Sequence, residues 1–310
     1  MPAPSAVRNV LGCGAVPVDI GRIGLWTSAL DRQPTTRVRE LAAELDEQGW
    51  GALWLPEAVG RDPFVHAALL LDASERMPVA TGIASIHARD AMAMKACWHT
   101  LSEAFPGRFL LGLGVSHQPM VENMRGGTYT KPLTTMREYL QRMDEAWFFA
   151  AAPSEPPQRV LAALGPKMLE LSRDQADGAH PYLVPPEHTA QAREMLGPER
   201  LLAPEQMVVL ESDPERARAI GRAALSIYVP GLPNYVNNLR RLGFTDDDLT
   251  DPASDRLVDA IIAWGSLDDI AARVRAHHDA GADHVAVQVL PYDDPERSLR
   301  DARTIAEALL

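Results

Sequence analysis

The chain has few of the residues on which several kinds of protein depend. Only two of its 310 residues are cysteines, Cys13 and Cys97, and they do not form a Cys-x-x-Cys pair. Two cysteines are too few for a disulfide framework, so we expect a reducing compartment and a cytoplasmic protein. Lysine is also scarce. Lys95, Lys131 and Lys167 are the only three, and the other basic side chains are arginines.

Positive charge and long apolar runs are scarce as well. The chain has 42 acidic and 30 basic residues and a formal net charge of −12. Nucleic acid and anionic membranes usually require a broad basic face, so neither is an expected partner. No stretch approaches ~18 uninterrupted apolar residues, and we expect neither a membrane span nor a signal peptide. The nine histidines show no metal-binding spacing, so no metal site is expected.

A recurring local pattern organises the rest of the chain, which is 46% hydrophobic and 23% charged. In residues 36–56 an amphipathic helix ends at Gly49, and a short apolar strand follows and stops at Pro56. Residues 266–291 repeat this order, with Gly281 closing the helix. A helix, a glycine, an apolar strand and a breaker form the repeating unit of a parallel sheet.

Eight such units can be counted, which favours an α/β fold and, within it, a (β/α)8 TIM barrel over an open doubly wound sheet. Two long connections, 115–132 and 228–264, are predicted as insertions after strand 4 and strand 7. No linker divides residues 1–310, so we expect one domain. The predicted strands are 23–26, 52–55, 79–84, 109–113, 160–164, 178–181, 206–211 and 283–290. The predicted helices are 36–48, 64–75, 90–104, 133–149, 166–175, 187–197, 213–226 and 267–279.

Two predicted strands end in glycine. Gly112-Leu-Gly114 resembles the start of a dinucleotide-binding fingerprint, but His117 stands where the third glycine is required and a long loop follows. A Rossmann domain is therefore disfavoured. The run from Thr81 to Ser85 ends a strand in small residues, which indicates either a bulge approached by a ligand or a corner that needs room.

Candidate charged and polar groups follow other strand ends. Gly165-Pro-Lys167 opens a predicted helix, whose free backbone amides together with the lysine could bind an anion. Glu57 comes directly after strand two and is the best-placed carboxylate. His87, His117 and His180 lie just past strand ends, whereas His277 and His278 are expected to be exposed at a helix terminus. Of the nine histidines, these three are therefore the candidates for a functional site.

Taken together, these segments resemble the luciferase-like monooxygenase family of (β/α)8 flavin and deazaflavin oxidoreductases. The resemblance lies in segments that span nearly the whole chain in the family's order. They are Leu53-Trp-Leu-Pro-Glu57, Thr81-Gly-Ile-Ala84, the stretch 105–114, Leu164-Gly-Pro-Lys167 with Ala176-Asp-Gly178, and the stretch 264–285.

The resemblance implies a cofactor site at these positions. Gly82 and Ile83 would be joined by a non-prolyl cis peptide bond that supports the middle ring of the cofactor, with Trp26 as an apolar wall. The cofactor-binding residues it implies are Trp26, Gly82, Ile83, Ser116, Gly165, Pro166, Lys167 and Met168. Glu57 is an expected acid or polar anchor, and His87 or His117 an expected proton donor.

The expected function is hydride transfer between coenzyme F420 and a small organic substrate, and an FMN-dependent monooxygenase is the alternative. A barrel that works through a Schiff-base lysine is less favoured, because no lysine stands at a strand end. A non-catalytic binding barrel is a third possibility. Ala58 and His117 occupy positions where sugar-phosphate dehydrogenases of the family often have His and an acid, which argues against that substrate. Family members often form homodimers, and we expect one here.

Overall fold

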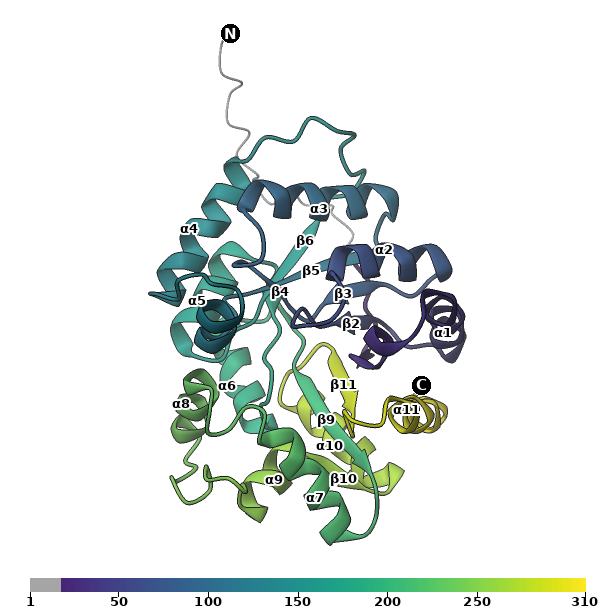
Figure 1. Ribbon diagram of the computed structural model, residues 1–310, viewed down its shortest axis with the longest axis vertical. Coiled ribbons are helices and arrows are strands. Elements are labelled where there is room, and N and C mark those ends of the chain that lie inside the picture. Colours follow the sequence, from purple (N-terminus) through teal and green to yellow (C-terminus); the bar gives the residue numbers. More distant parts are fainter. Residues whose placement is uncertain (1–17) are drawn as a thin grey trace.

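Strands and helices alternate along the part of the chain that the computed structural model describes, residues 18–310. The strands are β1 (Ile23–Trp26), β2 (Leu53–Leu55), β3 (Val79–Thr81), β4 (Ala84–Ser85), β5 (Phe109–Gly114), β6 (Gln158–Leu161), β7 (Gly178–Ala179), β8 (Leu201–Leu202), β9 (Glu205–Leu210), β10 (Ala263–Gly265) and β11 (Val285–Val289). The helices are α1 (Thr35–Gln48), α2 (Pro63–Ala73), α3 (Ala91–Ala104), α4 (Pro132–Glu145), α5 (Pro166–Gln175), α6 (Pro186–Leu196), α7 (Pro214–Leu225), α8 (Pro233–Arg241), α9 (Asp255–Ile261), α10 (Leu267–Asp279) and α11 (Pro295–Leu309). Figure 1 shows the strands gathered at the centre with helices arranged around them.

The strands form one curled parallel sheet. Its order is β10-β9-β11-β1-β2-β3-β5-β6-β7-β8, with β4 beside β5. Only Ala203 and Pro204 separate β8 from β9, and the Ala203 and Glu205 amides continue the pairing by donating to the carbonyls of Ala179 and Pro181. The run from β8 to β9 therefore has β7 on one side and β11 on the other. The α/β class and the parallel sheet confirm the coarser part of the fold prediction.

Local sequence explains where several elements begin and end. Helix α1 ends at Gly49, which has a φ of +85° that only glycine adopts freely. Helix α10 opens with a capping box in which the Ser266 side chain accepts from the Asp269 amide and the Asp269 side chain accepts from the Ser266 amide. Both signals could be read in the sequence, and both elements lie where it predicts them.

The interior of the curl is filled by side chains and forms the floor of the candidate site. Trp54 is fully buried, stacks on the His180 ring at a centroid distance of 4.2 Å, and donates from Nε1 to His284 Nε2 over 3.0 Å. Leu110 and Val160 pack in the same inner cluster. A second, larger apolar layer lies between the sheet and the surrounding helices. The interior of the curl around Trp54, Leu110 and Val160 is thus a packed core.

Some predicted boundaries are wrong. The predicted strand 160–164 is β6, which runs from Gln158 to Leu161. The predicted helix 133–149 ends at Glu145, where the Lys95 ammonium group donates to the carbonyls of Asp144 and Ala146 and closes the helix. Strand β10 and helix α11 were not among the predicted elements.

The expectation that His277 is exposed is also wrong. Its ring is fully buried, with Nδ1 2.8 Å from Thr189 Oγ1 and Nε2 2.9 Å from Gln206 Oε1, and burial lowers its pKa to about 3. His278 is partly buried. Among the described helices, none combines the length and the apolar character that crossing a membrane would require.

Candidate cofactor site

The end of the third strand forms a bulge against β5. Ala80 pairs with Leu110 and Ala84 pairs with Leu113, so the bulged side has four steps where β5 has three. The extra residue lies between β3 and β4, and the peptide bond between Gly82 and Ile83 is cis, as the family resemblance implies. Its role in supporting a cofactor ring stays a prediction.

The glycines at the end of β5 make room for this bulge. A Cβ atom on Gly112 would overlap the Thr81 carbonyl oxygen, and a Cβ on Gly114 would overlap the Ile83 side chain. The Thr81 hydroxyl bridges the interrupted ladder, because it donates to the Gly112 carbonyl over 2.7 Å and accepts from the Gly112 amide over 2.8 Å. Packing against the bulge therefore accounts for the Gly-Leu-Gly sequence.

Trp26 supports the bulge from the side of β1. Its Nε1 donates to the Gly82 carbonyl over 2.9 Å, and the side chain is buried. A Cβ atom on Gly82 would lie 2.5 Å from Trp26 Nε1 and 3.3 Å from His180 Nε2. Position 82 therefore requires glycine, because any larger residue would displace the Trp26 ring.

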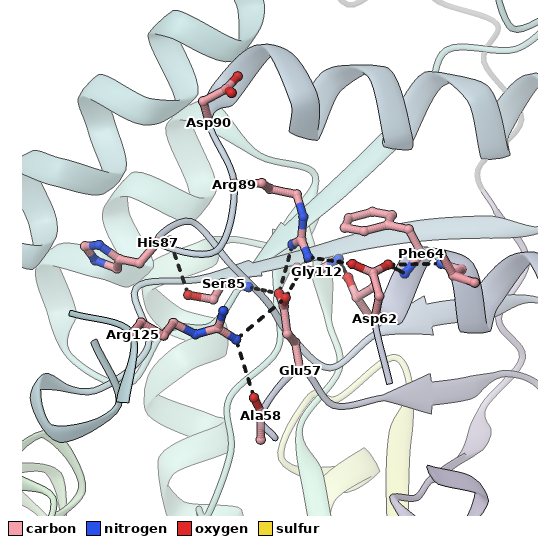
Figure 2. A network of polar contacts seen from close by, with 12 residues as sticks. Glu57, Ala58, Asp62, Phe64, Ser85, His87, Arg89, Asp90, Gly112 and Arg125 are labelled. Atoms are coloured by element: carbon pink, nitrogen blue, oxygen red, sulfur yellow. Dashed lines mark hydrogen bonds and ion pairs between the residues drawn. The ribbon is translucent and has the colours of Figure 1, made fainter. Parts of the chain in front are cut away.

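Glu57 lies behind the bulge in a closed ionic network (Figure 2). One carboxylate oxygen accepts from the Ser85 amide over 2.7 Å and from Arg89 Nη1 over 2.9 Å, and the other accepts from Arg89 Nη2 over 2.6 Å. Arg125 Nη2 is 3.9 Å from the same carboxylate. The glutamate side chain is only 6% exposed. This geometry favours a positioning role, since Glu57 fixes the backbone directly after the bulge.

Arg89 is itself held by two further groups. It contacts Asp62 Oδ2 over 3.1 Å and lies over the Phe64 ring at 4.8 Å. Asp62 caps helix α2 by accepting from the amides of Phe64 and Val65. The ion pair is thus joined to the start of α2, and this partner of Glu57 was not recognised in the sequence because it lies 32 residues further along the chain.

The two candidate proton donors come from different loops. The His87 ring is 5.9 Å from the Tyr129 ring, and Figure 2 shows it directed away from Glu57. His117 Nδ1 is 3.1 Å from Asn234 Oδ1, and its ring lies 5.3 Å from Tyr235. Burial lowers the pKa of both histidines, so both rings are neutral at neutral pH. Ser116, just before His117, has a φ of +57° and its carbonyl accepts from the Tyr129 hydroxyl.

The start of α5 combines a helix N-terminus with an adjacent cation, an arrangement that suits an anion. Gly165 is the N-cap and provides no side chain, Pro166 is the first helical residue, and Lys167 is exposed beside them. The backbone amide of Met168, in the same turn, donates to the Gly165 carbonyl over 3.0 Å. Arg241 from α8 adds a second cation, which the sequence did not suggest. Its guanidinium lies beside Gly165, where a Cβ atom would be 3.4 Å from Arg241 Nη2. Helix N-termini with adjacent cations are ready sites for phosphate.

A cluster of hydroxyl groups lines the opposite side of the bulge, and it too was missed in the sequence. The Tyr182 hydroxyl is 2.8 Å from the Tyr228 hydroxyl, 3.3 Å from the Tyr292 hydroxyl, and donates to Gln288 Oε1 over 2.9 Å. The Tyr182 ring lies 5.5 Å from the Trp26 ring. The only signal available was that Tyr182 and Tyr292 follow predicted strands.

These features fit a planar heterocycle that carries a phosphate. The bulge has no side chain at Gly82, the α5 start places a helix N-terminus beside Lys167, and His180 Nε2 and Glu205 Oε1 are buried polar atoms without a partner in the described part of the chain. Unsatisfied buried groups are costly, so they point to a ligand or ordered water. Over residues 18–310 no group of histidine, cysteine or acidic residues could hold a metal ion.

Comparison with known proteins identifies the family. The model of the luciferase-like monooxygenases matches residues 20–284, and the chain belongs to this family. A putative coenzyme F420-dependent oxidoreductase of Mycobacterium tuberculosis is 24% identical, with 86% of this chain and 94% of that protein covered. A 5,10-methylenetetrahydromethanopterin reductase of Methanolobus tindarius is 23% identical, with 81% and 90% covered.

Solved structures share the fold. An F420-dependent secondary alcohol dehydrogenase, in complex with an F420-acetone adduct, superposes with a TM-score of 0.73 at 13% identity, covering 94% of this chain and 99% of that chain. A type II Baeyer-Villiger monooxygenase of Pseudomonas putida, in complex with FMN, has a TM-score of 0.65 at 15% identity, with 93% and 97% covered. The luciferase-like fold predicted from the sequence is confirmed at this level.

Proposed function

We propose that the protein is a coenzyme F420-dependent oxidoreductase that transfers hydride between the deazaflavin and a small organic substrate. The observation that carries the proposal is the bulge at Gly82-Ile83, where the Gly82 carbonyl accepts from Trp26 and the peptide bond is the non-prolyl cis bond that the family resemblance implies. The names of the relative in Mycobacterium and of the F420-dependent secondary alcohol dehydrogenase that shares the fold support the choice of F420.

The chain's own residues would bind and orient the cofactor. Gly82, Ile83 and Trp26 support the ring, and the loop at Ser116 covers its edge. The turn formed by Gly165, Pro166, Lys167 and Met168 receives the phosphate, and Arg241 adds charge there. The bound deazaflavin would supply hydride, while the protein orients it and excludes water. His87 and His117 remain the proposed proton-transfer groups near the opening, and Glu57 the anchor of the bulge.

The finer architecture is proposed on the same basis. The run from β8 to β9 joins the two sides of the curl, which supports a complete (β/α)8 barrel with insertions at 115–132 and 228–264, after barrel strands 4 and 7. We also propose that residues 1–310 form one domain, that the protein is a cytoplasmic homodimer, and that its only other partner is a small molecule.

An FMN-dependent monooxygenase is the second candidate, because the same ring and phosphate groups suit FMN and a structural neighbour binds it. A Schiff-base enzyme finds no support. Lys95 donates to carbonyls at the end of α4, Lys131 is the N-cap of α4, and Lys167 is exposed. None of these lysines lines the interior of the sheet, where a reactive amine would be desolvated.

Separate titrations of the purified protein with F420 and with FMN, followed by cofactor fluorescence, test the proposal. We expect saturable binding of F420 and weaker binding of FMN. Tighter binding of FMN would favour the monooxygenase. If neither cofactor binds, the proposal is overturned in favour of a barrel that binds another ligand.

A further inference from the structure

The interior of the sheet holds a carboxyl group that has no cationic partner. Glu205 opens β9 and is 1% exposed. Its Oε2 accepts from the Leu183 amide over 3.2 Å, and its Oε1 has no hydrogen-bond partner among residues 18–310. No ion pair in this part of the chain involves it. A buried carboxylate without compensation is expensive, so the neutral acid is the favoured form.

A cluster of phenol groups lies on the face of β9 that carries this carboxyl, because Met207, two residues after Glu205, is 3.8 Å from the Tyr292 hydroxyl. Tyr182, Tyr228 and Tyr292 share one hydrogen-bonded cluster, which also includes the Gln288 amide, and the Tyr235 ring packs 5.4 Å from Tyr228. Tyr182, Tyr228 and Tyr292 are partly exposed, whereas Glu205 is buried. The cluster therefore leads from an inaccessible acid to the accessible side of the site.

The cluster also reaches the bulge. Tyr182 packs against Trp26, and Trp26 donates to the Gly82 carbonyl. A substrate placed over a ring that rests on Gly82-Ile83 would thus lie on the same side of the sheet as the phenols. The four tyrosines come from the segments after β7, α7 and β11 and from α8, so the long connection after β9 supplies half of them, Tyr228 and Tyr235.

The protonation states agree with this arrangement. Burial raises the pKa of Glu205 from its ordinary value of 4.5 to about 8, so the group carries a proton at neutral pH. Burial raises the pKa of Tyr182, Tyr228, Tyr235 and Tyr292, and a negative charge on Glu205 would raise each further. Burial lowers the pKa of His180 to about 4, so this ring is neutral. The four phenols and the His180 ring are therefore uncharged at neutral pH.

We propose that Glu205 stores the proton that the substrate gains together with hydride, and that the Tyr182 cluster conducts it to the substrate oxygen. This inference rests on the proposed function and deepens it, and it assigns the proton that reaches the substrate oxygen to this cluster in place of His87 and His117. A site that pairs a hydride donor with neutral O–H donors suits an acceptor whose oxygen becomes a hydroxyl group. The substrate class is therefore an aldehyde or ketone, or the corresponding alcohol in the reverse direction.

The step balances in the following way. Hydride from the reduced deazaflavin forms a C–H bond at the carbonyl carbon, and the π pair of the C=O bond moves to oxygen. That oxygen takes a proton from a phenol of the cluster and becomes a hydroxyl group. The phenol regains a proton from the Glu205 carboxyl, and the resulting carboxylate, which solvent does not reach, is reprotonated through the partly exposed phenols of the cluster. In the oxidising direction each transfer is reversed.

Infrared spectroscopy of the cofactor-free protein tests the stored proton directly. We expect a C=O band of a protonated carboxyl that disappears as the pH is raised through about 8. The band should be absent in Glu205→Gln and retained in Glu215→Gln, a control at an exposed glutamate in the first turn of α7. A wild-type protein without this band at neutral pH would overturn the proposal.

Reduction of acetone, cyclohexanone and benzaldehyde by reduced F420 tests the transfer. Glu205→Gln should lower kcat roughly 100-fold, the usual scale of general acid catalysis, while F420 binds within about twofold of wild type. Tyr182→Phe should lower kcat as well, and the double variant should be no slower than the slower single variant, because both act on one path. Wild-type kcat should fall above about pH 8, and this fall should vanish in Glu205→Gln.

The outcomes separate the two proposals. If the wild type binds F420 but reduces none of the three carbonyl compounds, the substrate class is wrong. If Glu205→Gln keeps wild-type kcat and pH dependence, the proton store is wrong. If F420 does not bind, the proposed function fails, and the infrared band then decides the state of Glu205 independently.

Discussion

Two buried carboxyl groups lie on different sides of the bulge, and they differ in their partners. Glu57 has both oxygens occupied by Arg89 and one also by the Ser85 amide. Glu205 has one backbone donor and one oxygen without a partner, among neutral phenols. Burial is similar, so the neighbours decide the role. A carboxylate that is bonded to a guanidinium stabilises the local structure. A buried carboxyl group without a cationic partner keeps its proton and can donate it.

Removal of the Arg89 guanidinium should have the largest effect, because it would leave the buried Glu57 carboxylate with only the Ser85 amide and the Arg125 guanidinium, which is 3.9 Å away. We expect Arg89→Met to lower the free energy of unfolding by about 3–5 kcal/mol, measured by urea denaturation. Arg39→Met is the matched control, since its pair with Asp72 is exposed (45% and 62%) and should contribute about 1 kcal/mol or less.

If Arg89→Met loses no more unfolding free energy than Arg39→Met, the contrast between Glu57 and Glu205 is wrong. Glu57 would then not depend on its ion pair with Arg89. The double variant Glu57→Gln/Arg89→Met sharpens the result. It removes both charges, and we expect it to be more stable than Arg89→Met alone.

The second prediction concerns the pH dependence that Glu205 gives to stability. Because folding raises its pKa from 4.5 to about 8, the folded protein binds this proton more tightly than the unfolded chain does. The resulting stabilisation is complete below about pH 4.5 and is lost as the pH rises toward 8, at ~1.4 kcal/mol per pH unit. Between about pH 6 and 7.5 the wild type should lose about 2 kcal/mol relative to Glu205→Gln.

Urea denaturation at both pH values measures this difference. The comparison with the variant cancels the contributions of the buried histidines, which titrate in both proteins. Glu215→Gln should follow the wild type. Parallel curves for the wild type and Glu205→Gln would show that Glu205 is ionised in the folded protein, as Glu57 is in its ion pair.

The third prediction concerns Gly82, which lies between the two carboxyl groups. In Gly82→Ala the new Cβ would lie 2.5 Å from Trp26 Nε1, so the Trp26 ring must shift away from the carbonyl that it holds. Overpacking of this kind costs about 1–3 kcal/mol, and we expect F420 affinity to fall by roughly 10- to 100-fold. Fluorescence titration measures the affinity, and circular dichroism checks that the protein is folded.

Gly231→Ala is the control for this substitution, because a Cβ there meets no atom within 4 Å. We expect it to bind F420 as the wild type does. Unchanged affinity in Gly82→Ala would show that the ring does not rest on this bulge. Gly82→Val should lose binding altogether, since its side chain is larger.

Much of the fold could be predicted because its signals are local. Gly49, Gly281 and the Ser266 capping box mark helix ends within a few residues of sequence. Helix α11 was missed although its buried positions, Ser298, Ala302, Ile305 and Ala306, recur at helical spacing, because the count of eight units ended at the predicted strand 283–290. Strand β10 has three residues, too few to show a period.

Local features of the candidate site were predicted where chain neighbours define them and missed where distant segments meet, and their binding of a cofactor stays a prediction. The bulge at Gly82 and the start of α5 are both local, and both were recognised. The Tyr182 hydroxyl meets its partners 46 and 110 residues away, and Glu57 meets Arg89 across 32 residues. A single sequence holds no record of such contacts, so the role of each carboxyl could only be decided in the folded structure.

The smallest effect should come from the substitution of Lys167. Its charge is exposed, whereas the carboxyl groups of Glu57 and Glu205 are buried. If its ammonium group attracts the cofactor phosphate, Lys167→Ala should weaken F420 binding by a few-fold, about 1 kcal/mol or less, because water and salt screen an exposed charge. The dissociation constant should also depend less on salt concentration than in the wild type. Arg275→Ala, which removes an exposed charge from α10, is the control and should leave the affinity and its salt dependence unchanged. The same salt dependence in Lys167→Ala as in the wild type would remove Lys167 from the phosphate site and leave Arg241 as its side-chain cation.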